Sequence, residues 1–278
     1  MGMKGELPAR WKRDYVLWVE VFAVLNLAFL SVDIYLAHSE NQFQRRAEYI
    51  PLLFSIVAPL LLAGALWLRE FHGRQGWWRW TGFIVGACSI AVGVAGVIYH
   101  LDSQFFYERT LRSLVYAAPF AAPLAYAGIG MILLLDRMVA GGSPDWPRWV
   151  LFLTLGGFLG NFLLSLTDHA GNGFFHWTEW IPVASSAFAV TFLLLLFFTS
   201  VTDRYMAVCG WVLLLQAVVG FTGFVFHANA DVHGISRSLF QNVVDGAPPF
   251  APLLFPDLAL LGWIGLWALL STRSAAAR

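Results

Sequence analysis

Charged side chains are scarce in this chain. Of its 278 residues only 12% are Asp, Glu, Lys or Arg, whereas 59% are apolar. An ordinary soluble domain carries about 25% charged residues. A soluble fold of this size needs a largely polar exterior, so it has no place for so much apolar surface. The composition therefore excludes a water-soluble enzyme and a disordered segment, and it indicates a multi-spanning membrane protein.

Basic residues are not in excess. The 17 Lys and Arg residues are balanced by 17 Asp and Glu residues. No basic surface is therefore available for phosphate backbones, and we expect no nucleic-acid partner. Only two of the basic residues are Lys, and neither lies in an apolar run, which excludes a retinal Schiff base. The preference for Arg is typical of a GC-rich bacterial genome.

Cysteine is rare and the common catalytic motifs are missing. The two cysteines, Cys88 and Cys209, lie inside apolar runs, where they provide no disulfide framework for the loops. The sequence has no P-loop, G-x-G-x-x-G, G-x-S-x-G or paired C-x-x-C in a suitable place. The connections expected on the cytoplasmic side are too short for a nucleotide-binding domain.

Long apolar runs are abundant instead. About 20 apolar residues suffice for a helix to cross the hydrocarbon core, and continuous runs favour helices over the alternating strands of a barrel. Eight runs occur, at residues 15–37, 50–68, 80–100, 113–135, 149–168, 181–200, 206–227 and 249–270. We therefore predict an all-α polytopic membrane protein with eight transmembrane helices. The first run is too long for a signal peptide, so we expect it to remain in the mature protein.

Positive charges are distributed unevenly about these runs. Twelve lie in the two termini and the even-numbered loops: Lys4, Arg10, Lys12, Arg13, Arg69, Arg74, Arg79, Arg137, Arg148, Arg204, Arg273 and Arg278. Five lie on the other side: Arg45, Arg46, Arg109, Arg112 and Arg237. Cytoplasmic loops carry more Lys and Arg than external ones. We therefore predict a bacterial inner (plasma) membrane protein with both termini in the cytoplasm.

The sequence contains an internal duplication. The pattern H-x9-E-[YW]-I-P begins at His38 and again at His169. Other matches are the Asn26 to Asp33 and Asn161 to Asp168 spacings, the segments 96–100 and 223–227, and Arg-Ser-Leu at 112 and at 237. An even number of spans in each half keeps the halves parallel. We therefore predict two four-helix repeats, residues 1–136 and 137–278, related by a pseudo-twofold axis along the membrane normal.

Histidines gather on the predicted outer side. Four of them, His38, His100, His169 and His227, end the four helices that run outward. About the twofold axis the first span should face the fifth, and the third should face the seventh. We therefore expect His38 to meet His169 and His100 to meet His227, all at one depth. A histidine at a helix end is also at home in the interface without a ligand.

Carboxylates accompany these histidines. Glu48 and Glu179 each precede the proline that begins the next helix, whereas several aspartates fall within apolar runs, where an ionisable group needs a partner. Imidazole and carboxylate bind zinc, copper and non-haem iron, and two histidines can bind haem iron. The predicted metal ligands and their supporting acids are His38, His100, His169, His227, Glu48, Glu179, Asp33 and Asp168. We expect the histidines to bind the metal and the aspartates to orient them.

The sequence gives weaker indications of a role for four further polar residues. Asp257 follows Pro256 within the last run, where a kinked helix can line a cavity. Arg112 and Arg237 are expected to contact lipid phosphates, or to neutralise buried acids or an anionic substrate. Glu20 is expected to reach the inner interface or to pair with Lys12 or Arg13.

Three classes of function follow from these patterns. The first is a metal or haem protein whose site opens to the periplasm, with redox or metal-assisted chemistry on a lipophilic molecule such as a quinone or isoprenoid. The second is a transporter or channel with a site between the repeats, which parallel repeats and intramembrane acids both permit. The third is a structural or assembly subunit of a larger membrane complex, which suits the 16% aromatic content.

Overall fold

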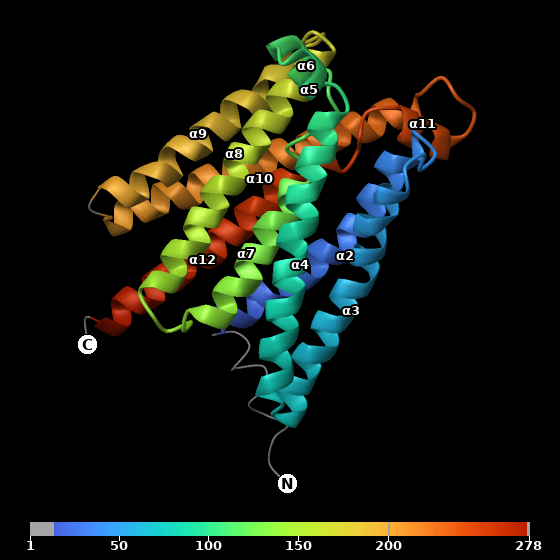
Figure 1. Cartoon of the computed structure of the whole chain (residues 1–278). Helices are drawn as coiled ribbons and strands as arrows, with labels where there is room; N and C mark the ends of the chain where they lie inside the picture. Colours follow the sequence, from blue (N-terminus) through green and yellow to red (C-terminus); the bar gives the residue numbers. More distant parts are fainter. Residues whose placement is uncertain (1–13, 200, 277–278) are drawn as a thin grey trace.

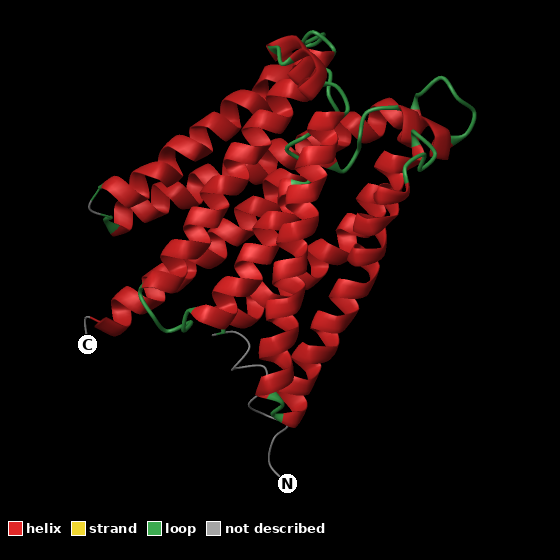
Figure 2. Ribbon diagram, viewed as in Figure 1, coloured by secondary structure: helices red, strands yellow, loops and turns green. Residues whose placement is uncertain are grey.

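The structure is a computed structural model that describes residues 14–199 and 201–276. Lys4, Arg10, Lys12, Arg13 and Arg278, which the charge count used, lie outside the described residues. The described chain consists of helices and loops, with no strand (Figure 2). The α-helices are α2 (Tyr15–Ser39), α3 (Tyr49–His72), α4 (Gln75–Asp102), α5 (Phe105–Glu108), α6 (Leu111–Val115), α7 (Leu124–Met138), α8 (Asp145–Gly171), α9 (Trp180–Phe198), α10 (Asp203–Val232), α11 (Leu239–Asp245) and α12 (Leu254–Ala276). Three 3-10 turns precede α3, α9 and α12: η1 (Arg46–Glu48), η2 (Trp177–Glu179) and η3 (Ala251–Leu253).

Seven of the described helices are long and apolar enough to cross a membrane. They are α2, α3, α4, α8, α9, α10 and α12, taken with the turns that precede α3, α9 and α12. Large apolar side chains such as Leu60, Trp80 and Trp211 point outward from them and are exposed, as expected for helices in contact with lipid. The prediction of a helical multi-pass membrane protein is confirmed by these helices.

The fourth predicted span, residues 113–135, differs from the prediction. The structure has the short helix α6, a non-helical segment at residues 116–123, and then α7 of 15 residues. Pro119 and Pro123 explain the interruption, because a proline inside a helix removes a backbone donor and disfavours helical backbone before it. The prediction of one uninterrupted helix from residue 113 is therefore wrong. At 1.5 Å per residue α7 is about 22 Å long.

The long helices alternate in direction, so the molecule has two ends (Figure 1). We call the end that holds the start of α2 and the end of α12 the inner end, and the opposite one the outer end. α3 and α4 are joined at the inner end by a tight turn in which Gly73 has a φ of 65°, a backbone conformation that favours glycine. The described chain therefore begins and finishes at the same end of the bundle.

Three clusters of buried apolar residues hold the helices together. One lies among α2, α3, α4 and α7, around Leu27, Leu62 and Leu133. A second lies among α8, α9, α10 and α12, around Phe158 and Leu213. The third joins α2 and α7 to α8 and α12, and it includes Val19, Trp146 and Leu261. The N-terminal and C-terminal groups of four helices thus each have a core, and a third core connects them.

The short helix α7 packs closely against α4. A Cβ atom at Gly130 would lie 2.5 Å from the carbonyl oxygen of Gly86, so only a residue without a side chain fits there. Pro123, just before α7, lies against Gly93 and Gly96 of α4. Before α12, Pro252 lies in the same way against Gly220 and Gly223 of α10. Small residues at these crossings allow the backbones to approach.

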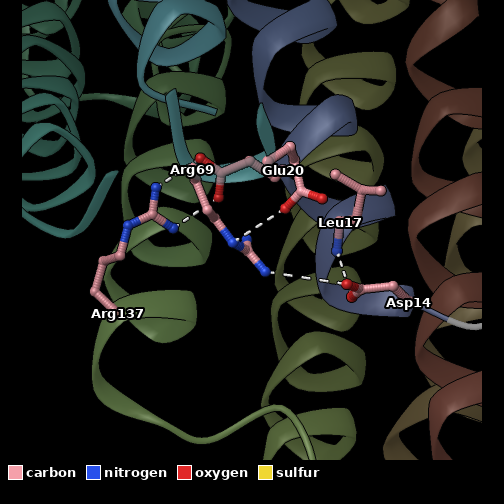
Figure 3. A network of polar contacts seen from close by, with 6 residues as sticks. Asp14, Leu17, Glu20, Arg69 and Arg137 are labelled. Carbon is pink, nitrogen blue, oxygen red and sulfur yellow. Dashed lines mark hydrogen bonds and ion pairs between the residues drawn. The ribbon is translucent and has the colours of Figure 1, made fainter. Parts of the chain in front are cut away.

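A group of charged residues ties α7 to the other helices at the inner end. Arg137 of α7 pairs with Glu20 of α2 (Figure 3). The Arg137 guanidinium also lies 3.8 Å from the ring centre of Trp78. The Trp78 ring also faces Arg69, whose guanidinium lies 4.4 Å from its centre. The partner of Glu20 is therefore Arg137, whereas the expected partners Lys12 and Arg13 lie outside the described residues.

Candidate functional site

His38, at the end of α2, lies beside a glutamate and a second histidine at the outer end. Its Nδ1 is 3.6 Å from Oε2 of Glu48, which ends the turn η1. Its ring centre is 6.3 Å from that of His100, near the end of α4, and the two ring planes are inclined by 76°. We call His38, Glu48 and His100 the N-terminal histidine cluster.

His169, at the end of α8, has a matching set of neighbours. Its Nδ1 is 3.6 Å from Oε2 of Glu179, which ends the turn η2. His227 of α10 lies within electrostatic range of the His169 ring. We call His169, Glu179 and His227 the C-terminal histidine cluster.

The second histidine of each cluster is fixed by a backbone carbonyl. Nδ1 of His100 donates to the Pro119 carbonyl oxygen at 2.8 Å, and Nδ1 of His227 donates to the Pro248 carbonyl oxygen at the same distance. A carbonyl oxygen only accepts hydrogen bonds, so in each ring Nδ1 must carry the proton. A neutral imidazole with a proton on Nδ1 has its lone pair on Nε2. Both rings therefore present Nε2 as an acceptor or ligand atom.

The first histidine of each cluster has the same preferred proton position. The carboxylates of Glu48 and Glu179 face Nδ1 of His38 and His169, and an ionised carboxylate only accepts hydrogen bonds. Within the described chain, Nε2 of none of the four histidines makes a hydrogen bond. The side chains of His38 and His169 are 20% and 19% exposed, so their free nitrogens can be reached from outside.

The two loops that follow His38 and His169 adopt the same backbone. Phe43 and Phe174 have positive φ values of 50° and 52°, which are unusual for residues other than glycine. The amide of each phenylalanine donates to the carbonyl oxygen of the preceding histidine, at 3.0 Å for Phe43 and 2.8 Å for Phe174. Strained backbone of this kind persists only where surrounding contacts hold it.

Aromatic stacking and an asparagine hold each of these loops. Phe43 stacks on Tyr49 with ring centres 4.8 Å apart, and Phe174 stacks on Trp180 at 3.8 Å. Asn41 donates to Oε1 of Glu48 at 3.2 Å. Asn172, with its amide turned to satisfy its neighbours, donates to Oε2 of Glu179 at 3.2 Å. Each loop therefore fixes the glutamate that faces its histidine.

Short helices from one half lie against the other half at the outer end. α6 packs against the end of α8, and α11 packs against the end of α2 (Figure 1). Tyr35 of α2 lies near Phe240 of α11, with ring centres 6.5 Å apart, and Phe29 lies 5.1 Å from Phe250. The N-terminal half thus covers α8, which carries His169, and the C-terminal half covers α2, which carries His38.

The pairing of the histidines differs from the one that the sequence suggested. His38 lies beside His100 of the same half, and the histidine that acts electrostatically on His169 is His227, also of the same half. Among the described residues no ring contact joins His38 to His169 or His100 to His227. α2 and α4 pack mainly on α3 and α7 rather than on each other, and their histidine rings approach only at the outer end.

The predicted aspartates are not part of either pairing. Asp33 is half-buried and Asp168 is exposed, and neither carboxylate makes a hydrogen bond or ion pair with the described residues. Asp257 of α12 accepts a hydrogen bond of 2.9 Å from Nδ2 of Asn26 on α2. Asp257 therefore connects the two halves in the middle of the bundle, away from the histidines.

The two predicted arginines lie on the surface. Arg112 is exposed, and its nearest ring contact is Tyr116, 6.0 Å from the guanidinium carbon. Arg237 is exposed in the loop before α11 and has no partner in the described chain. Neither arginine neutralises an acid of the histidine clusters among the described residues.

Within residues 14–199 and 201–276, no three His, Cys, Asp or Glu side chains are arranged so that they could hold a metal ion. Each cluster nevertheless offers two imidazole nitrogens. A haem iron needs no more than two axial ligands from the protein, and a metal ion can complete its shell with water or substrate.

Several residues of the outer end escaped the sequence analysis. Phe43 and Phe174 each follow the cluster histidine by five residues, and Asn41 and Asn172 follow it by three, so extending the repeat pattern through the loops would have found them. Asp231, which the sequence already places among the carboxylates near the histidines, lies one turn beyond His227 on α10. It is 3% exposed and has no hydrogen-bond partner for either carboxylate oxygen among the described residues. Its burial comes from the loop around α11, which sequence periodicity does not reveal.

Comparison with known proteins gives no functional assignment. No protein-family model matches the chain, and neither the curated proteins nor the solved structures contain a match. The function must therefore be argued from the geometry of the outer end.

Proposed function

We propose that this chain is an eight-span protein of a bacterial inner membrane that binds a metal cation, as a free ion or as haem iron, at its outer end. Both termini lie in the cytoplasm and the histidine clusters open to the periplasm. The eighth span is α7, completed by the non-helical segment before it. An even number of spans agrees with a described chain that begins and finishes at the inner end (Figure 1).

The proposal includes two parallel four-helix repeats, residues 1–136 and 137–278. Matched contacts support it. The distance of 3.6 Å from histidine to glutamate occurs in both halves, and so does the distance of 2.8 Å from histidine to a carbonyl preceding the last helix of that half. The stacked loop phenylalanine also occurs in both. Two copies of one four-helix unit would produce all of these pairs.

The observation that carries cation binding is the anchoring of the four imidazoles. Nδ1 of His38 and His169 faces a carboxylate, and Nδ1 of His100 and His227 faces a backbone carbonyl. Histidines that bind metals almost always donate their other ring nitrogen to a carboxylate or carbonyl, which fixes the tautomer and the ring orientation. The four Nε2 atoms are thereby prepared as ligands.

The spacing of the rings agrees with this role. A metal lies about 2.0–2.1 Å from each ligand nitrogen, so two imidazoles on one metal have ring centres about 4.5–6.5 Å apart. The 6.3 Å between the ring centres of His38 and His100 falls within this range. His38 and His100 would be the residues that hold a metal ion or haem iron in the N-terminal half.

The first experiment is elemental analysis and an optical spectrum of the full-length protein purified in detergent. We expect stoichiometric iron, copper or zinc, or a Soret band if the cation is haem iron. His72 at the inner end of α3 supplies a matched control, because His72→Asn changes a histidine outside both clusters. His38→Asn should lower the cation content and His72→Asn should leave it unchanged. Protein without any cation after expression with all three metals and haem precursor would contradict the proposal.

A second candidate function for His100 and His227 has one specific observation in its favour. Their hydrogen bonds satisfy carbonyl groups of non-helical segments, and unsatisfied backbone groups are costly in a membrane. In this case the histidines are structural anchors and the chain is a scaffold or assembly subunit. His100→Asn separates the two functions, because the asparagine amide nitrogen can replace Nδ1 as a donor but nothing replaces Nε2. If His100 binds the metal, the His100→Asn variant should contain less cation than wild type. If His100 is only an anchor, the cation content of the variant should equal that of wild type.

Chemistry on a lipophilic molecule is a further part of the proposal. A cation at the outer end would lie near the headgroup level, where the ring of a quinone or the head of an isoprenoid can approach. The test is a change in the cation's optical or paramagnetic signal when a short-chain quinone is added to the purified protein. An unchanged signal, while the cation is present, would leave cation binding intact and contradict the quinone step.

A further inference from the structure

A cavity of about 470 Å³ lies at the inner end, far along the helices from the histidine clusters. It is formed by the beginning of α8, the end of α9 and the end of α12. This volume falls within the range of about 300–1,000 Å³ that is common for small-molecule sites in proteins. None of the proposed metal ligands lines it.

The walls of the cavity are apolar and its rim is cationic. Leu151, Leu196 and Leu269 line it, and two arginines, Arg148 and Arg273, lie at its edge together with threonine hydroxyl groups. An apolar wall beside a pair of cations matches an amphiphile with an anionic head. It does not match a free inorganic anion, because such an ion has no apolar group to contact the leucine wall.

The two arginines differ in how they are held. Nη2 of Arg273 donates to the Val201 carbonyl oxygen at 2.8 Å, and its Nη1 lies 3.6 Å from Oδ1 of the exposed Asp203. Arg148 is exposed and makes no hydrogen bond or ion pair within the described chain. Arg273 is thus a fixed part of the rim, whereas the charge of Arg148 is available to a ligand.

We propose that this cavity binds an anionic phospholipid, with the phosphate at Arg148 and Arg273 and the upper part of an acyl chain against the leucines. This proposal rests on the proposed orientation, in which the inner end faces the cytoplasm, where the leaflet contains anionic lipids. Basic pockets between transmembrane helices on that side are typical binding places for anionic head groups. The proposal is independent of metal binding at the outer end.

The test is native mass spectrometry of the full-length protein in detergent, titrated with phosphatidylglycerol and with phosphatidylcholine of the same acyl chains. We expect tighter binding of phosphatidylglycerol, and Arg148→Gln should weaken it about fivefold, the effect of one Arg near an anionic lipid. Binding of phosphatidylcholine should change little. Arg79→Gln is the matched control, because Arg79 is exposed at the same end and does not line the cavity.

A second variant tests whether lipid binding requires the apolar part of the cavity. Thr199 is exposed at the rim, so Thr199→Trp should fill the entrance without disturbing the core, and it should weaken binding of both lipids. Equal affinity of wild type for the two lipids, or equal effects of Arg148→Gln and Arg79→Gln, would overturn the proposal. So would displacement of phosphatidylglycerol by millimolar inorganic phosphate, which would mean a site for a free anion.

Discussion

Arg137 and Glu20 form a two-armed ion pair in which Nη1 and Nη2 each donate to a different carboxylate oxygen at 2.6 Å, with both side chains fully buried. The residues are 117 positions apart and join α7 to α2. Nε of Arg137 also donates to the Trp78 carbonyl oxygen at 3.2 Å, which adds α4. A helix too short to span by itself is thus fixed at its inner end by one side chain.

Removing one member of this pair should destabilise the protein strongly. Glu20→Gln or Arg137→Met leaves a buried charge without its partner, and the expected cost is about 3–5 kcal/mol. Arg137→Met should cost more, because Asp136 is buried beside the pair and can partly compensate Arg137 when Glu20 is lost. The measurement is the free energy of unfolding in mixed micelles, followed by intrinsic tryptophan fluorescence.

The double variant Glu20→Gln/Arg137→Met is the control for this prediction. It removes both charges together, so it should be more stable than Arg137→Met alone. A double variant whose loss equals the sum of the single losses would contradict the assignment of these residues as a coupled pair.

The crossing of α4 and α7 should tolerate no added side chain. A Cβ atom at Gly93 would lie 2.7 Å from the backbone nitrogen of Ala127 and 2.9 Å from the Pro123 carbonyl oxygen. Gly93→Ala should therefore destabilise the protein by about 1–3 kcal/mol through overpacking. Gly128→Ala on α7 is the matched control, since nothing lies within 4 Å of its added Cβ atom. If both substitutions cost the same in thermal unfolding, the close approach of these helices is incorrect.

The topology can be tested with reporter fusions at two positions. Gly142 lies between α7 and α8, and Asn229 lies near the outer end of α10. Fusions truncated after these residues should report opposite sides of the membrane, with the Gly142 fusion active for a cytoplasmic reporter such as green fluorescent protein. A Gly142 fusion that is inactive with the cytoplasmic reporter would mean that α7 does not cross the membrane, because α2, α3 and α4 alone would leave this position on the outer side. Reports from one side for both positions would mean that α8, α9 and α10 do not all cross.

Local features of the sequence predicted much of this molecule. Seven apolar runs are long helices. The matching spacings from His38 to Glu48 and from His169 to Glu179, which indicated a duplication, correspond to two matching contacts of 3.6 Å. These predictions succeeded because helix length and the reach of a short loop depend on neighbouring residues. The break at Pro119 and Pro123 was missed because the apolar run 113–135 continues through both prolines, and the prediction counted its length without the interruption.

Contacts between distant segments could not be predicted in this way. Glu20 and Arg137 appear in the sequence as isolated charges, and nothing local indicates that α2 and α7 place them face to face. The pairing of His38 with His100 depends on which helices are neighbours in a half, and the duplication alone does not fix this. The cavity at the inner end is formed by three separate segments, so it has no sequence signature.

The measurement that tests the central claim most directly is the cation content per chain of wild type, His100→Asn, and the double variant His100→Asn/His227→Asn, each compared with His72→Asn. We expect His100→Asn to lose about half of the bound cation and the double variant to lose nearly all of it, because Nε2 lone pairs disappear while a donor to the Pro119 and Pro248 carbonyls remains. The thermal unfolding temperature of the cation-free proteins should change little. Equal cation content in all four proteins, or no cation in any, would contradict the account.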